Sequence, residues 1–147
     1  MLKNDEKWFQ VSLRLTGDTL PIDKVSEKLQ IEYSNIGRKG EHIKNNPRYA
    51  KYQTNIWGWT FTKDSAISFE VQIDEMLDVL EKKQAALKEL LILPDVEGEL
   101  FLGFSSANGQ GGAHFSAALL HRIAALGLSV GLDLYPRNDV TDTETKS

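Results

Sequence analysis

Residues 8–15 read WFQVSLRL, and apolar and polar side chains alternate along this stretch with the period of a half-buried strand. The apolar positions are Phe9, Val11, Leu13 and Leu15. Successive side chains of a strand point to opposite faces, so one face of this strand is expected to pack on a core. The sequence therefore predicts a sheet that helices cover on one face.

The residues that follow this strand form stretches of helical periodicity and stretches of strand periodicity in turn. Pro21 is tolerated in the first turn of the next helix, because its missing N–H would have no partner there. Periodicity is then lost from residue 30 to residue 53, which predicts a long loop. The later elements are expected as a strand at 55–62, one long helix from Ser65 or Ser68 to Leu91, a strand at 99–105, a helix from Ser116 to Gly127 and a strand at 128–135.

The order of these elements is strand, helix, strand, helix, strand, helix, strand. We predict an α+β fold with a four-stranded sheet and three helices (β-α-β-α-β-α-β), arranged as a ferredoxin-like or related sandwich. A small doubly wound α/β sheet is the alternative. One domain is expected to span residues 1–135, followed by a polar, disordered tail at 136–147.

The composition of the 147-residue chain is that of an ordinary globular domain, with 41% hydrophobic and 26% charged residues. The chain has no cysteine, which excludes disulfides, thiolate zinc sites and cysteine nucleophiles. Residues 1–7 are charged and lack the apolar run of a secretory signal. No stretch approaches the ~18 apolar residues of a membrane span, so we expect a cytoplasmic protein without membrane contact.

Charge is unevenly placed along the chain, although the net charge is only −4. Residues 38–52, called the basic segment below, carry five cations against the single acid Glu41. The cations are Arg38, Lys39, Lys44, Arg48 and Lys51. Tyr49 and Tyr52 lie among them, so one interpretation is phosphate contact with base stacking and the other is a solvated structural loop. The net negative charge weighs against a general nucleic-acid binder.

Acidic residues follow one side of the long predicted helix. At about 100° per residue, four carboxylates fall in one sector beside the apolar face. They are Glu70, Asp74, Asp78 and Glu81, called the acidic stripe below. This stripe is a candidate surface for a basic protein partner, although a solvated helix face is the favoured interpretation of the stripe taken alone. Arg38, Lys39, Arg48 and Tyr49 form the second candidate partner-binding set.

Short motifs occur along the chain in a definite order: LPIDKVSEKLQI at 20–31, RKGE at 38–41, WGW at 57–59 and GLDLY at 131–135. Together these resemble the domain-of-unknown-function family 4279, over most of the chain up to Tyr135. The resemblance implies a small bacterial intracellular domain to which no catalytic residues are assigned. Similar small acidic domains often serve as immunity proteins, which bind and silence a toxin made by the same cell, and this step is an analogy.

A glycine loop joins the third predicted strand to the last helix. Residues 109–112 read GQGG, and Asp133 ends the next strand, as in part of a dinucleotide-binding fingerprint. His114 stands at the third glycine position, and no Gly-Lys-Ser/Thr of a Walker loop follows. A structural turn is the favoured interpretation, and anion binding at the helix N-terminus is the alternative.

Neither a metal site nor a cofactor is predicted. His42, His114 and His121 form no pair at the three- or four-residue spacing that presents two ligands to one metal. Ser105 and Ser106 lie near His114 in the sequence without a Gly-x-Ser-x-Gly motif, which leaves a hydrolase as a remote option.

We therefore predict a non-enzymatic protein-binding module, namely an immunity protein that binds and neutralises a cognate toxin domain. The alternative is a small-ligand or nucleotide-binding regulatory domain that uses the glycine loop at 109–112. The sequence names neither the toxin nor the oligomeric state.

Overall fold

β1 (Lys7–Gly17) is the central strand of a five-stranded sheet in the computed structural model, which describes residues 6–135. The strand order is β2-β3-β1-β4-β5, and β1 pairs antiparallel with both β3 and β4. β2 pairs antiparallel with β3, whereas β4 and β5 are parallel, so the sheet is mixed. The other strands are β2 (Asn35–Gly37), β3 (Asn55–Thr60), β4 (Glu97–Ser106) and β5 (Ser129–Tyr135).

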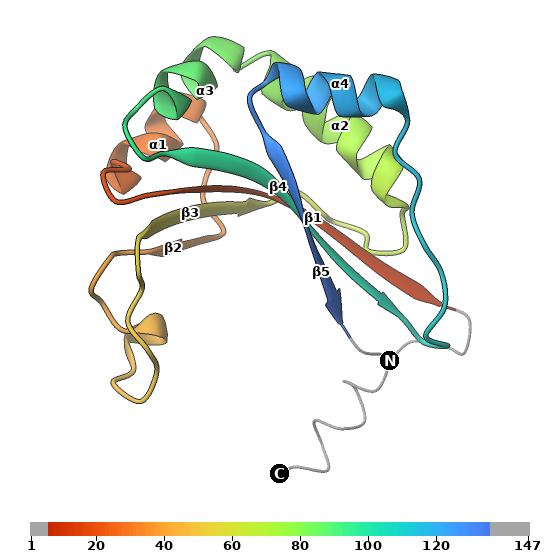
Figure 1. Cartoon of the computed structure of the whole chain (residues 1–147), viewed down its shortest axis with the longest axis horizontal. Coiled ribbons are helices and arrows are strands. Elements are labelled where there is room, and N and C mark those ends of the chain that lie inside the picture. The colour runs from red at the N-terminus through yellow and green to blue at the C-terminus, as the bar shows by residue number, and fades with distance from the viewer. Residues whose placement is uncertain (1–5, 136–147) are drawn as a thin grey trace.

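Helices lie along one face of this sheet (Figure 1). They are α1 (Ile22–Leu29), α2 (Phe69–Glu81), α3 (Gln84–Leu91) and α4 (Ala117–Ala125). The predicted alternation of β1 is confirmed, because its apolar positions are buried beneath the helices and its polar positions are only half-buried. Burying each leucine of this core stabilises the fold by about 2 kcal/mol.

The α+β class is confirmed, but the predicted count of four strands and three helices is wrong. Within residues 6–135 there are five strands and four α-helices. The additional strand is β2, which lies inside the predicted loop at 30–53 and pairs Ile36 with Trp57. Three residues are too short to show a period, so β2 leaves no pattern in the sequence. Because the helices share one face, the doubly wound alternative is not what the structure shows.

The predicted long helix is divided into α2 and α3. Lys83 leaves the helical region, with φ −113° and ψ 20°, and the chain turns there. The turn lets Leu87 and Leu90 of α3 enter the core beside α1. Neither proline nor glycine marks this position, so packing rather than local preference ends α2.

The two predicted ends of α4, which depend on local chemistry, are confirmed. The Ser116 side chain accepts a hydrogen bond from the Leu119 N–H at 3.1 Å and caps α4. Gly127 follows α4 with φ +80°, the left-handed conformation that glycine tolerates best. Ser68 stands at the N-cap of α2 without a side-chain cap bond.

A buried polar residue joins α2 to the sheet. The Gln72 side-chain amide donates to the backbone carbonyls of Phe9 and Ile67 at 3.2 and 2.7 Å, and its oxygen accepts from the Thr62 hydroxyl. A buried amide with every bond made costs little and fixes the position of the helix, whereas an unmade bond would cost about 1–3 kcal/mol.

Among the described residues, no helix is long and apolar enough to cross a membrane. The predicted tail at 136–147 and the first residues of the predicted domain, 1–5, lie outside the described residues.

Candidate functional site

The basic segment forms a projection between β2 and β3, at the edge of the sheet and away from the helices (Figure 1). Its two arms are joined by backbone hydrogen bonds. The Tyr52 N–H donates to the Glu41 carbonyl at 2.9 Å, and the Ile43 N–H donates to the Ala50 carbonyl at 3.0 Å. His42 and Lys51 pair between these bonds as an isolated antiparallel bridge. The segment predicted as a loop is therefore an ordered, hairpin-like projection.

The far end of the projection is a tight turn built around a short 3-10 helix, Ile43–Asn45. Lys44 and Asn45 both have left-handed backbone conformations, with φ of 58° and 55°. Such a conformation costs a non-glycine residue about 1 kcal/mol, so surrounding contacts must hold it. The Asn46 side chain accepts from the Arg48 N–H at 3.0 Å, and the Asn46 carbonyl accepts from the Tyr49 N–H at 2.9 Å. These bonds fix the turn.

The base of the projection is tied to the body of the protein by two ion pairs. The Arg38 guanidinium donates to Asp23 of α1 at 2.7 Å, and the Lys39 ammonium donates to Asp18 at 2.9 Å. Hydrogen bonds from these two cations hold the pKa of Asp23 and the pKa of Asp18 below their usual values. The Lys39 N–H also donates to the Asn55 side chain at 2.8 Å. Two of the five cations of the basic segment thus have a structural role.

The other three cations face solvent. Within the described part of the chain, Lys44, Arg48 and Lys51, called the tip cations below, have no carboxylate within ion-pair distance. Tyr49 lies among them with 46% of its surface exposed, and the Lys44 ammonium lies 5.6 Å from the centre of its ring. The predicted residues Arg48 and Tyr49 therefore share one exposed, cationic surface, while Arg38 and Lys39 support it from below.

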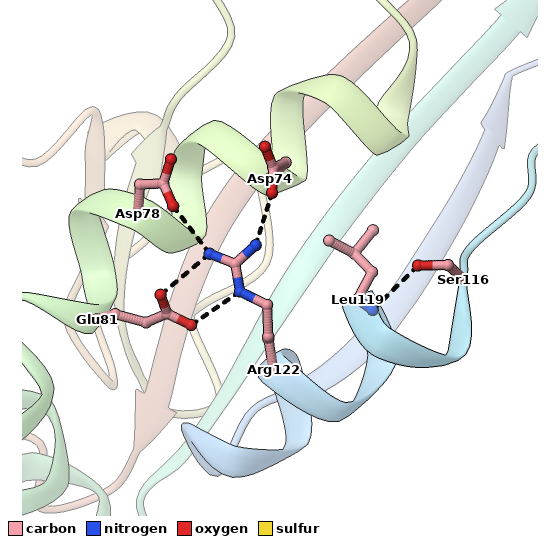
Figure 2. Close-up of polar contacts among 6 residues, drawn as sticks. All are labelled: Asp74, Asp78, Glu81, Ser116, Leu119 and Arg122. Carbon is pink, nitrogen blue, oxygen red and sulfur yellow. Dashed lines mark hydrogen bonds and ion pairs between the residues drawn. The ribbon is translucent and has the colours of Figure 1, made fainter.

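The acidic stripe has a partner inside the protein, Arg122 of α4 (Figure 2). The Arg122 guanidinium donates to Asp74 at 2.6 Å, to Asp78 at 3.0 Å and to both oxygens of Glu81 at 2.9 and 3.0 Å. The hydrogen bond from Arg122 lowers the pKa of Glu81, and the hydrogen bonds that Arg122 donates to Glu81 and Asp74 raise the pKa of Arg122. These four residues, called the Arg122 cluster below, join α2 to α4.

Glu70, the fourth residue of the stripe, lies in the first turn of α2 and is not among the carboxylates that Arg122 contacts. Sequence reasoning placed Arg122 in a helix but gave it no role. It is the only charged residue of α4, and an isolated arginine in an apolar helix was the available signal. The stripe as a partner-binding surface stays a prediction, but three of its four carboxylates already have an internal partner.

The glycine loop is a turn organised by Asn108. The Asn108 side-chain oxygen accepts from the Ser106 hydroxyl at 2.7 Å and from the Gln110 N–H at 2.9 Å. Gly109 and Gly111 have φ of +72° and +130°, which side-chain-bearing residues rarely adopt. Glycine is thus required here by the backbone, and nucleotide binding by the loop stays a prediction.

The tryptophans of β3 contribute to the core. Trp57 is fully buried, and its indole N–H donates to the Ser26 hydroxyl of α1 at 3.0 Å. Trp59 is partly buried against Phe61. Among residues 6–135, no group of three His, Asp or Glu side chains is arranged to hold a metal ion.

Comparison with known proteins gives a family but no function. The family model described as "Domain of unknown function (DUF4279)" matches residues 6–137, nearly the whole chain. No curated protein and no solved structure matches the chain.

Proposed function

The chain belongs to the DUF4279 family, and from this premise we propose that it is a non-enzymatic protein-binding module whose basic segment enters an acidic cleft of a partner protein. The observation that carries the proposal is the geometry of the basic segment. Its base is anchored by ion pairs and its turn is fixed by hydrogen bonds. Its tip presents three exposed cations, which pair with no carboxylate of the described residues, beside an exposed tyrosine.

The shape of the basic segment favours a macromolecular partner. Sites for small molecules are concave and enclose most of the ligand. Lys44 lines a hollow of about 210 Å³ with Glu41 and His42, which is smaller than a typical ligand site. Arg48 and Lys51 do not line this hollow, and the projection that carries them can insert into a concave surface of another molecule. Arginine and tyrosine are also the residue types that most often dominate binding energy in protein interfaces.

The rigidity of the segment supports tight binding. Association costs conformational entropy for each loop and side chain that becomes ordered, at about 0.5–1.5 kcal/mol per flexible side chain. A projection that is already held by Asp18 and Asp23 avoids part of this cost. The expected partner surface carries Asp and Glu side chains that pair with Lys44, Arg48 and Lys51.

A protein partner suits the charge distribution better than a nucleic acid does. The whole chain has a net charge of −4, which repels an extended polyanion, whereas a local acidic cleft meets only the tip cations. A projection of this kind could occlude an acidic active-site cleft, so we propose that the chain is a cytoplasmic immunity protein that neutralises a toxin in this way. The proposal therefore includes a toxin as the partner protein.

Site-specific photo-cross-linking tests the proposal in the native host. A photo-activatable amino acid at Tyr49 should give one protein adduct of defined mass, and the same group at Ile92, which is exposed on the helix side, should not. The captured protein should arrest growth when produced alone and lose this effect when this chain is co-produced. A nucleic-acid adduct at position 49, or equal protein adducts at both positions, would contradict the proposal.

A further inference from the structure

β5 has an apolar row that the helices leave uncovered. Val130, Leu132 and Leu134 are 42%, 57% and 64% exposed. In the parallel ladder they stand beside Leu100, Leu102 and Phe104 of β4, and neighbouring partners in a ladder point to the same face. Leu100 and Leu102 are fully buried in that row. The core face of the sheet thus continues onto β5 but loses its cover there.

α4 extends this apolar surface. Arg122 points to α2, and Leu120 lies about 160° away from it around the helix. Leu120 is 44% exposed and therefore lies on the side of α4 that faces away from α2. Figure 1 shows β5 starting beside α4 and running out beyond the helix layer.

The two edges of the sheet differ in protection. β2 is only three residues long and leads into the basic segment, a short and charged edge of the kind that resists pairing. β5 is seven residues long, with Asp133 as its single charged residue and no lysine or proline. In the described part of the chain, no strand pairs with its outer side. An edge that is long, apolar and unprotected marks an interaction site.

A second copy of β5 complements this edge. If two copies pair antiparallel with Leu132 opposite Leu132, then Val130 stands opposite Leu134 and Asp133 opposite Gly131. All apolar positions then meet apolar positions, and the two carboxylates avoid each other. The chain's own continuation after Tyr135 fits less well, because residues 136–147 contain Val140 as their only large aliphatic residue.

We propose that the chain forms a symmetric dimer through antiparallel pairing of β5, with the twofold axis at Leu132. The two sheets become one ten-stranded sheet, and Leu120 of each copy borders the junction. The basic segment follows β2 at the opposite edge, so a dimer presents two basic segments at its two ends. This inference does not depend on the function of the basic segment.

The interface is small. One seven-residue strand per copy buries less than the ~1,600 Å² of a standard interface, so we expect dissociation in the micromolar range. Sedimentation of the full chain between about 1 and 100 µM should show the mass rising from monomer to dimer. Leu132→Lys places two ammonium groups on the axis and should give a monomer with unchanged melting temperature, whereas the matched control Ile92→Lys should still dimerise.

Single cysteines test the register, since the natural chain has none. Opposite residues of an antiparallel pair have Cβ atoms about 5 Å apart, near the span of a disulfide. Leu132→Cys should therefore cross-link with itself under mild oxidation. Val130→Cys and Leu134→Cys should each fail alone, because each lies about 13 Å from its own copy, and should cross-link when mixed.

A wild-type chain that stays monomeric at 100 µM would overturn the proposal. So would a Leu132→Cys protein that cross-links no faster than Ile92→Cys. Efficient self-linking of Val130→Cys would overturn the register centred on Leu132.

Discussion

The acidic stripe and the basic segment carry opposite charges, and the structure pairs them in different ways. On α2, three carboxylates meet one guanidinium from α4, so the charges hold two helices together. In the basic segment, the ion pairs among residues 6–135 form at the base, through Arg38 and Lys39, and the tip cations remain exposed. The comparison teaches that a run of charge is available to another molecule only where no neighbouring element supplies the counter-charge.

The Arg122 cluster is more than a set of surface pairs. An isolated exposed ion pair contributes about 0–1 kcal/mol, and salt screens it. The Arg122 side chain is only 27% exposed and bonds to three carboxylates at once. Without the guanidinium, the three carboxylates would repel one another beside α4. We therefore expect changes in this cluster to act on stability and changes at the tip of the basic segment to act on binding.

Reversing the charges of the cluster should have the largest effect on stability. In Asp74→Lys, Asp78→Lys, Glu81→Lys combined, three ammonium groups surround Arg122, and the melting temperature should fall on the order of 5–10 °C. Adding Arg122→Glu restores opposite charges and should recover at least about half of the loss. If the triple variant melts at the wild-type temperature, the cluster does not hold α2 to α4.

Removing the guanidinium alone should have a smaller effect. Arg122→Met keeps the aliphatic packing but leaves three carboxylates without their cation, and we expect the melting temperature to fall by about 4 °C. Lys88→Met is the matched control, since Lys88 is exposed on α3 and makes no ion pair with a described residue. If calorimetry gives the same fall in melting temperature for both variants, the Arg122 cluster contributes no more to stability than an ordinary surface charge.

The base and the tip of the basic segment should differ when one arginine is removed from each. Arg38→Met breaks the pair with Asp23, so amide exchange at residues 40–52 should accelerate several-fold while the melting temperature changes by less than about 2 °C. Arg48→Met removes an exposed tip cation, which has no ion pair with a described residue, and should leave exchange unchanged. Equal exchange rates in the two variants would show that the ion pair does not order the projection.

At acidic pH the Arg122 cluster should lose its small contribution to the stability of the fold. Because the hydrogen bond from Arg122 lowers the pKa of Glu81 from its usual 4.5, the cluster stabilises the fold fully above pH 4.5 and loses this effect as pH falls through the lower native value. The difference in melting temperature between wild type and Arg122→Met should be constant from pH 7 to about pH 5 and narrow below pH 4.5. If the difference in melting temperature vanishes already at pH 6, a titratable group other than Glu81 causes the stabilisation.

Local patterns predicted the elements that depend on neighbouring residues. Residues close together in the sequence determine the period of two in β1 and the ends of α4 at Ser116 and Gly127. The structure confirms these features. The break at Lys83 was missed because the packing of α3, rather than a proline or glycine, causes it. β2 was missed because three residues carry no period.

The candidate site shows the same division between local and distant information. Composition located both charged regions, and the helical period placed the stripe on one side of α2. The partner of the stripe is 41 residues away in the sequence at its nearest, from Glu81 to Arg122, so no local pattern connects them. The partners of Arg38 and Lys39 are likewise on other elements, so the sequence could not separate anchoring cations from exposed ones.

The affinity of the partner captured through position 49 tests the central claim most directly. Its dissociation constant should be measured by calorimetry for the wild type, for Lys44→Glu, Arg48→Glu, Lys51→Glu combined, and for Arg122→Met. Interface charge pairs are each worth about 2–5 kcal/mol when desolvated, so the triple variant should bind at least about 100-fold more weakly at an unchanged melting temperature. Arg122→Met should bind within about twofold of wild type. A triple variant that binds as tightly as the wild type, or a larger loss with Arg122→Met, would contradict recognition through the basic segment.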